Sequence, residues 1–251
     1  MDFVRDAIKK ATQEESAATR PFVILTYAQS LDGCIGSTDN TKPLLLSCPE
    51  SLFVTHCIRA SCDGVLVGAG TVRNDNPRLT VRGLEHSHGI TTSPRPVVLD
   101  TTLTAVTPSS NIVTLHNKPI VLCSYAPSNP AYSAIEVRRA ALEAEGVAVA
   151  NVFNGTALPH EGISLFTALE TLKSQFGIET LMVEGGSRVI GAFLALGRDV
   201  VDLLIVTVAP VFVGEGGVKA FTGTDNDGDM VRIVDPVYRQ FGRDMVLAGS
   251  L

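Results

Sequence analysis

The chain has 251 residues, of which 45% are hydrophobic and 18% charged. This length suits one large α/β domain or two small ones, and the composition excludes global disorder. The net charge is −6 and no cluster of Lys and Arg occurs, so nucleic acid is not expected as a partner. No run reaches the roughly 18 apolar residues of a membrane-spanning helix, so no membrane partner is expected either.

The cysteines indicate reduced thiols rather than a disulfide framework. Their number is odd and no C-x-x-C pair occurs: Cys34, Cys48, Cys57, Cys62 and Cys123. This usage is typical of a cytoplasmic protein. Neither Cys nor His falls at zinc-ligand spacing, so we expect no metal.

The N-terminal segment, residues 1–20, predicts an extension ahead of the main domain. It carries acids and lacks the apolar core of a signal peptide. Phe3, Val4 and Ile8 recur at helical spacing, which predicts a short amphipathic helix. Residues 21–251 are then expected to form a single domain.

Short apolar runs alternate with helical patterns along most of this domain. The candidate strands are 22–28, 64–68, 96–100, 120–124, 147–150 and 181–183. The candidate helices are 49–60, 129–145, 164–175 and 188–196. Ser47 can cap the first of these helices. The alternation predicts an α/β fold with a mainly parallel central sheet and helices on both faces.

The C-terminal part breaks the alternation. Residues 200–213 form a long apolar run and residues 245–248 another, with no convincing helix between them. We expect these runs to pair as an antiparallel couple at one edge of the sheet. A long apolar strand near an edge must be covered, which favours a homodimer.

The stretch from Arg59 to Gly83 has the composition of a ligand site. The buried run 64–68 leads into Gly68-Ala69-Gly70, and polar residues follow at 71–75. A glycine-rich turn after a buried strand is typical of the ligand-binding edge of an open α/β sheet, where free N–H groups suit a phosphate. On spacing alone, a strand-to-helix turn with a solvated rim of Arg and Asp explains the stretch equally well.

A second glycine-rich turn is the sequence EGGSR, residues 184–188. It follows a buried strand and opens a helix, whose N-terminal amides favour a phosphate. Paired glycines also serve tight α/β turns without any ligand, so the motif alone leaves both explanations open. No G-x-G-x-x-G string occurs, so the Rossmann fingerprint is absent.

Three blocks of the sequence resemble one family. They occur in this order: TYAQSLDGCIG, GVLVGAGTVRNDNPRLTVR and LMVEGGSRVIG. They are similar to the reductase of riboflavin biosynthesis, from about Phe22 to the C-terminus. The resemblance implies a dihydrofolate-reductase-like fold, a homodimer, and reduction of a ribosylamino-pyrimidine phosphate to its ribitylamino form with NADPH.

The resemblance also implies where NADPH binds. The residues expected to contact it are Ala28, Thr71, Asp75, Gly185, Gly186, Ser187, Arg188 and Val189. The turn at 185–189 would hold the pyrophosphate, and Ala28 would lie beside the nicotinamide. The cation for the 2′-phosphate is left open between Arg188 and Lys118.

The expected substrate is a small pyrimidine ribosylamine phosphate, whose phosphate needs cationic donors. Arg59 and Arg82 match the family's phosphate-binding positions. Leu79 would pack against the ligand, and Glu184 would accept from its hydroxyl or amino groups. Helix capping by Arg59 and a solvated strand end at Arg82 are the alternatives. Asp75 and Glu184 are the candidates for proton transfer.

Bacterial relatives join this reductase to a zinc deaminase that carries H-x-E and P-C-x-x-C. Neither string occurs in this chain. The sequence therefore resembles the stand-alone reductase, and a diamino pyrimidinone is the expected substrate rather than its deaminated form. A dihydrofolate reductase and a non-catalytic nucleotide-binding module are the other interpretations.

Overall fold

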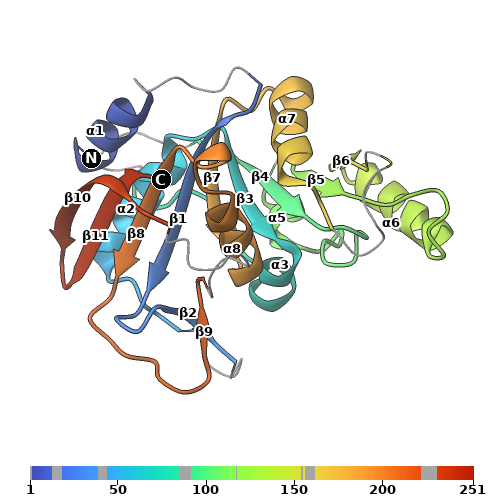
Figure 1. Ribbon diagram of the computed structural model, residues 1–251. Helices are drawn as coiled ribbons and strands as arrows, with labels where there is room; N and C mark the ends of the chain where they lie inside the picture. Colours follow the sequence, from blue (N-terminus) through green and yellow to red (C-terminus); the bar gives the residue numbers. More distant parts are fainter. Residues whose placement is uncertain are drawn as a thin grey trace.

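The computed structural model describes residues 2–12, 19–38, 44–84, 92–116, 118–153, 155, 162–221 and 231–251. The strands of its main sheet lie side by side in the following order (Figure 1): β10 (Val234–Phe241), β11 (Asp244–Ser250), β8 (Leu203–Val208), β1 (Phe22–Gln29), β7 (Thr180–Gly185), β3 (Gly64–Gly68), β4 (Arg95–Leu99), β5 (Ile120–Cys123) and β6 (Ala148–Asn151). Neighbours from β8 to β6 are parallel. The mainly parallel sheet is therefore confirmed.

The described helices are α1 (Asp2–Thr12), α2 (Pro49–Ala60), α3 (Ala69–Asp75), α5 (Asn111–Thr114), α6 (Tyr132–Ala144), α7 (Leu165–Phe176), α8 (Ser187–Leu196) and the 3₁₀ turn η1 (Gly197–Asp199). They cover both faces of the sheet. Side chains alternate along each strand, so neighbouring residues of one strand pack against helices on opposite faces. Ile24 of β1 packs in the core beneath α1, α2 and α6, whereas Val23 and Leu25 pack against α7 and α8. The predicted coverage of both faces is confirmed.

The parallel strands end on the same side of the molecule. In Figure 1 they point downward, and a small antiparallel pair of β2 (Cys34–Ser37) and β9 (Gly217–Lys219) lies below them. Ligands of open α/β sheets bind at this carboxyl edge. Among the described helices, none is both long and apolar enough to cross a membrane.

The predicted antiparallel C-terminal edge of the sheet is confirmed, but its outermost strand is not the predicted one. The run 200–213 gives only the strand β8, which lies inside the sheet between β1 and β11. Its antiparallel partner β11 was predicted. The outermost strand is β10, whose polar and apolar residues gave no clear strand pattern. The sheet edge that a second copy could cover is therefore β10 and not β8.

The start of α2 also differs from the prediction. Its N-cap residue is Cys48, not Ser47, and the Cys48 side chain does not cap the helix. The carboxylate of Asp244, from the β10–β11 hairpin, takes that role. Its Oδ2 accepts from the Cys48 amide at 2.7 Å and from Ser51 Oγ at 2.5 Å. A hairpin 196 residues farther along the chain thus fixes the start of α2.

Removing the Asp244 carboxylate is expected to destabilise the fold. Asp244→Ala leaves the Cys48 amide without its acceptor and leaves the buried Ser51 hydroxyl only its longer bond of 3.2 Å to the Cys48 carbonyl, at a cost of about 1–3 kcal/mol. Urea unfolding measures this change. Ser51→Ala removes one donor and keeps the cap on Cys48, so its cost should be smaller. Equal stability of Asp244→Ala and the wild type would contradict the capping role.

A candidate active site at the carboxyl ends of the strands

One open pocket of about 450 Å³ lies where β3 and β7 end. It brings together six residues that the sequence predicted as site residues: Arg59, Thr71, Asp75, Leu79, Arg82 and Glu184. Val67, Asn76, Pro77, Arg78 and Asn111 complete the lining. The two ligand-site features that the sequence predicted, the stretch 59–83 and the strand end at Glu184, therefore meet in space.

Glu184 owes its place in the pocket to an irregularity in the sheet. Leu66 of β3 pairs with Val183, but the next residue, Val67, pairs with Gly185. Glu184 is the extra residue in β7, and such a bulge re-aims a side chain at the edge of a sheet. The bulge therefore turns a strand residue into a pocket residue.

Arg59 and Glu184 form a bidentate ion pair at the pocket wall. Arg59 Nε donates to Glu184 Oε1 at 2.7 Å, and Nη2 donates to Oε2 at 2.6 Å. Nη1 donates to the Thr80 carbonyl at 2.6 Å. None of these acceptors is a carbonyl of α2, so the helix-capping alternative for Arg59 is wrong. Arg59 instead ties together the end of α2, the end of β7 and the segment 79–82.

The segment 76–82 follows α3 without regular secondary structure and forms one side of the pocket. Side chains from elsewhere fix its backbone. His56 Nδ1 accepts from the Arg82 amide at 3.3 Å, and Asn111 Nδ2 donates to the Asn76 carbonyl at 2.6 Å. Leu79 takes a left-handed φ of 52°, which non-glycine residues adopt at a cost.

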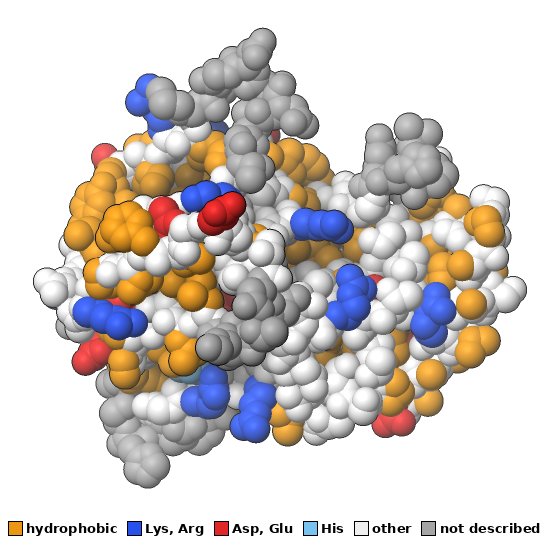
Figure 2. Space-filling model, turned by 90° about the horizontal axis from the view of Figure 1, so that it is seen from below, with side chains coloured by type: hydrophobic (Ala, Val, Ile, Leu, Met, Phe, Trp, Pro, Cys, Tyr) orange, Lys and Arg blue, Asp and Glu red, His pale blue; other side chains and the backbone are white. Residues whose placement is uncertain are grey.

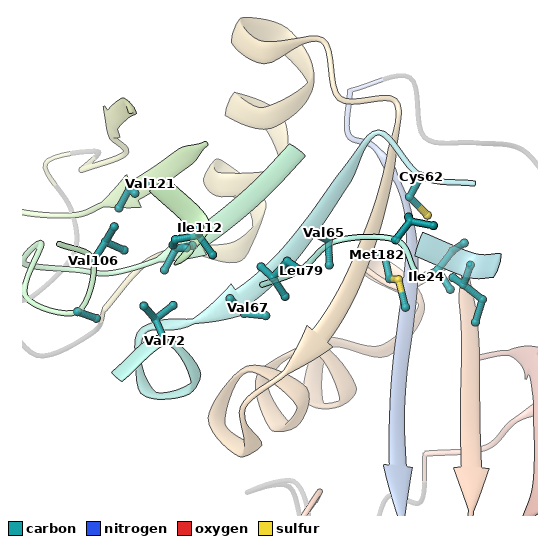
Figure 3. Packing of buried hydrophobic residues seen from close by; sticks show 14 of the residues in the cluster. Ile24, Cys62, Val65, Val67, Val72, Leu79, Val106, Ile112, Val121 and Met182 are labelled. Atoms are coloured by element: carbon teal, nitrogen blue, oxygen red, sulfur yellow. The ribbon is translucent and has the colours of Figure 1, made fainter. Parts of the chain in front are cut away.

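Burial of Leu79 offsets that cost. Its side chain lies beside Val65 and Val67 of β3, as Figure 3 shows, and belongs to the core beneath α2 and α6. The predicted contact of Leu79 with a ligand stays a prediction, because the residue is only 4% exposed. Leu79 is nevertheless one of the residues that line the pocket.

The second glycine-rich turn lies directly against Thr71. A Cβ placed on Gly186 would come 2.9 Å from Thr71 Oγ1, and Gly186 has a φ of 83°. Gly185 has a φ of 127°, so neither position suits a side chain. The turn opens α8, whose N-cap residue Gly186 provides no side-chain cap. The first amides of α8 are therefore available to an anion.

The first glycine-rich segment is not a turn. Gly68 ends β3, and residues 69–75 form the helix α3. Gly68 is needed for packing, since a Cβ there would come 2.8 Å from Val189 Cγ2 of α8. Its role is close contact between α8 and β3.

The remaining residues predicted to bind the cofactor lie at different distances from this turn. Ser187 and Arg188 begin α8, and Arg188 is exposed. Ala28 lies near the carboxyl end of β1, paired with Thr207 of β8. Lys118 precedes β5 at the amino ends of the strands, where its carbonyl accepts from Arg95 Nε at 2.5 Å. Of the two candidates for the 2′-phosphate, only Arg188 lies on the side of the pocket.

Asp75, the last residue of α3, is the other carboxylate of the pocket. Desolvation raises its pKa above the ordinary value of an aspartate. A carboxyl group with a raised pKa is suited to proton transfer. No group of three or more His, Cys, Asp or Glu residues in the described part of the chain could hold a metal ion.

Sequence reasoning missed two kinds of pocket residue. Arg78 lies inside the stretch that the sequence singled out, but nothing distinguished it from a solvated arginine. Asn111 lies on α5, far along the chain, and no local pattern marks it. Figure 2 looks onto this face from below and shows Lys and Arg side chains scattered over it, without one continuous basic patch. Recognition of an anion here must depend on individual arginines.

Comparison with known proteins identifies the family of this chain. Residues 21–247 match the family described as the RibD C-terminal domain. The chain belongs to this family. The 2,5-diamino-6-ribosylamino-4(3H)-pyrimidinone 5′-phosphate reductase of Debaryomyces hansenii is 34% identical over 93% of this chain and 91% of its own. The reductase of the same name from Archaeoglobus fulgidus is 31% identical over 78% of this chain and 83% of its own.

A solved structure supports the fold over the whole chain. The riboflavin biosynthesis reductase Rib7 of Saccharomyces cerevisiae is 29% identical, with a TM-score of 0.74, and the match covers 100% of this chain and 98% of that one. The resemblance to the riboflavin-biosynthesis reductases and the predicted fold class are thereby confirmed. The family match begins at Pro21, so α1 lies outside it.

The raised pKa of Asp75 has a consequence for stability. The folded state favours the protonated carboxyl, so the contribution of Asp75 to stability falls as the pH rises through its titration. Asp75→Asn should therefore melt at a higher temperature than the wild type at neutral pH, with the difference vanishing in acid. Scanning calorimetry of both proteins at a series of pH values from acid to neutral measures the effect.

Asp63 is a matched control for this prediction. Its Oδ2 accepts from the Glu179 amide at 3.0 Å and from the Thr180 amide at 2.8 Å. Asp63→Asn therefore removes a charge that the fold uses and should not raise the melting temperature. A lower melting temperature of Asp75→Asn at neutral pH would contradict the inferred desolvation.

Proposed function

We propose that the protein is an NADPH-dependent oxidoreductase that reduces 2,5-diamino-6-ribosylamino-4(3H)-pyrimidinone 5′-phosphate to the ribitylamino product of riboflavin biosynthesis. The observation that carries this proposal is the closeness of Gly186 to Thr71, since a Cβ added to Gly186 would lie 2.9 Å from Thr71 Oγ1. It places the glycine-rich turn beside Thr71, which lines the ionic pocket. The fungal and archaeal relatives, which are named as reductases of this compound, supply the substrate.

The residues around the turn fit a dinucleotide. The uncapped start of α8 and the side-chain-free Gly185 and Gly186 suit a pyrophosphate, and we assign Ser187 and Val189 to the same contact. Thr71 and Asp75 would face the cofactor from α3, and Ala28 would lie beside the nicotinamide. Arg188 is our candidate for the 2′-phosphate. When bound, NADPH supplies the hydride for the reduction.

The other end of the pocket suits the substrate. We assign Arg59 and Arg82 to the phosphate side, Leu79 to the floor, and Glu184 to the ribityl hydroxyls or the pyrimidine amino groups. In the reaction, the ribosylamine opens to an imine, C1′ gains the hydride and the nitrogen gains a proton. We assign that proton to Asp75 or Glu184, the two carboxyl groups among the described residues that line the pocket. The protein thus contributes positioning and electrostatics.

The direct test is oxidation of NADPH by the purified protein with the diamino substrate, generated in situ. We expect substrate-dependent loss of reduced nicotinamide absorbance, faster with NADPH than with NADH. The deaminated pyrimidinedione and dihydrofolate are the comparison substrates. A higher kcat/KM with the dione than with the diamino compound would show that the deaminated pyrimidinedione is the substrate. Binding of NADPH without turnover of any of them would support a non-catalytic nucleotide-binding module.

Gly186→Val should weaken the cofactor before the substrate. The new side chain would collide with Thr71 Oγ1 and would be strained at a φ of 83°. Titration of NADPH fluorescence should show a rise in Kd of about ten-fold or more, the size of one lost charge-assisted contact. Gly177→Val is the control, since that glycine has a φ of 65° but nothing within 4 Å of its Cβ position. Equal loss of cofactor affinity in both variants would contradict the assignment.

We also propose a homodimer that covers the edge strand β10. Val237 and Tyr238 on this strand are 48% and 59% exposed, and the neighbouring Met245 on β11 is 51% exposed. An apolar unpaired edge favours association. Light scattering should give twice the chain mass of 26.6 kDa at micromolar concentration, and Tyr238→Glu should reduce the mass. A monomeric wild type would contradict the proposal.

A further inference from the structure

Within the described part of the chain, the charged side chains that line the pocket are three arginines and two carboxylates. They are Arg59, Asp75, Arg78, Arg82 and Glu184. Arg59 and Glu184 neutralise each other through two hydrogen bonds of 2.7 and 2.6 Å. The positive charge that remains for an anionic ligand therefore comes from Arg78 and Arg82.

Both of these arginines are free to bind. They are exposed, and within the described ranges neither guanidinium donates a hydrogen bond or joins an ion pair. Their backbones are nevertheless fixed. The Arg78 carbonyl is hydrogen-bonded to His116 Nε2 at 2.5 Å, and the Arg82 amide donates to His56 Nδ1 at 3.3 Å. Two unpaired cations thus project from a fixed segment into one pocket.

We infer that Arg78 is a second binding residue for the substrate phosphate and acts together with Arg82. This inference rests on the proposed function for the identity of the substrate. A phosphate monoester carries a charge of about −1.5 to −2 at neutral pH, which two guanidinium groups match. Arg59, which the proposed function also assigns to the phosphate side, shares its charge with Glu184, so the unpaired charges there are those of Arg78 and Arg82.

The test compares the substrate with its dephosphorylated form. The quantity compared is kcat/KM for the substrate divided by kcat/KM for its dephosphorylated form. If Arg78 binds the phosphate, Arg78→Ala should lower this ratio by about ten-fold, the size of one charge-assisted hydrogen bond. The loss should appear in KM, with kcat little changed. Arg78→Lys should restore part of it, because an ammonium keeps the charge but not the planar fork.

Arg73→Ala is the matched control. This neighbouring arginine is exposed on α3 and lies outside the pocket, with one contact of 3.5 Å from Nη1 to Thr104 Oγ1. It loses the same charge, so its ratio should stay unchanged. An Arg78→Ala variant with the wild-type ratio, or with equal losses on both substrates, would overturn the inference.

A binding measurement separates this inference from the proposed function. Ribose 5-phosphate, titrated by calorimetry, should bind about ten-fold more weakly to Arg78→Ala than to the wild type. If the wild type reduced no pyrimidine substrate but showed this difference, the proposed reaction would be wrong and the phosphate site would stand. If ribose 5-phosphate bound both proteins equally, Arg78 would not be a phosphate residue.

Discussion

The buried ion pair between Arg59 and Glu184 is the interaction on which the geometry of the site depends. It joins three parts of the chain that are distant in sequence: the end of α2, the bulge of β7 and, through the Thr80 carbonyl, the segment 79–82. The two side chains are 9% and 15% exposed. A pair so far removed from water adds little net stability, but loss of one partner leaves a buried charge and is costly. The pair therefore specifies an arrangement more than it stabilises the fold.

The position of Glu184 also affects the second half of the site. Gly185 and Gly186 follow it directly and open α8, so the bulge that aims Glu184 into the pocket sets where that helix begins. Thr71 of α3, which follows β3, lies so close to Gly186 that a Cβ there would come 2.9 Å from its Oγ1. Both ends of the pocket are thus built from the two neighbouring strands β3 and β7. A dinucleotide at one end and a sugar phosphate at the other would then share this strand pair.

The parallel sheet could be predicted because its strands are short apolar runs that helical patterns separate. The length of β8 was predicted wrongly. Apolar residues continue on both sides of this six-residue strand, so composition could not locate its ends within the run 200–213. β10 has mostly exposed residues and only acquires its role by pairing with β11. The cap of α2 by Asp244 depends on a contact across 196 residues. No local pattern can report such a contact.

The site shows the same division between local and distant information. The family resemblance located Thr71, Leu79, Arg82 and Glu184, which all line one pocket. It could not show that Arg59 is already bonded to Glu184, because that depends on the bulge in β7. It gave no reason to choose Arg78 over other exposed arginines. It also gave no reason to reject Lys118, whose position at the amino ends of the strands follows from the parallel direction of β4 and β5.

The most direct test of this account is a double-mutant cycle on the central pair. Arg59→Met and Glu184→Met each leave one buried charge unpaired, whereas the double variant leaves none. Urea unfolding should therefore give single losses of about 3–5 kcal/mol and a double loss far below their sum. Additive losses would contradict the account, because they would show that the two side chains act independently in the folded protein.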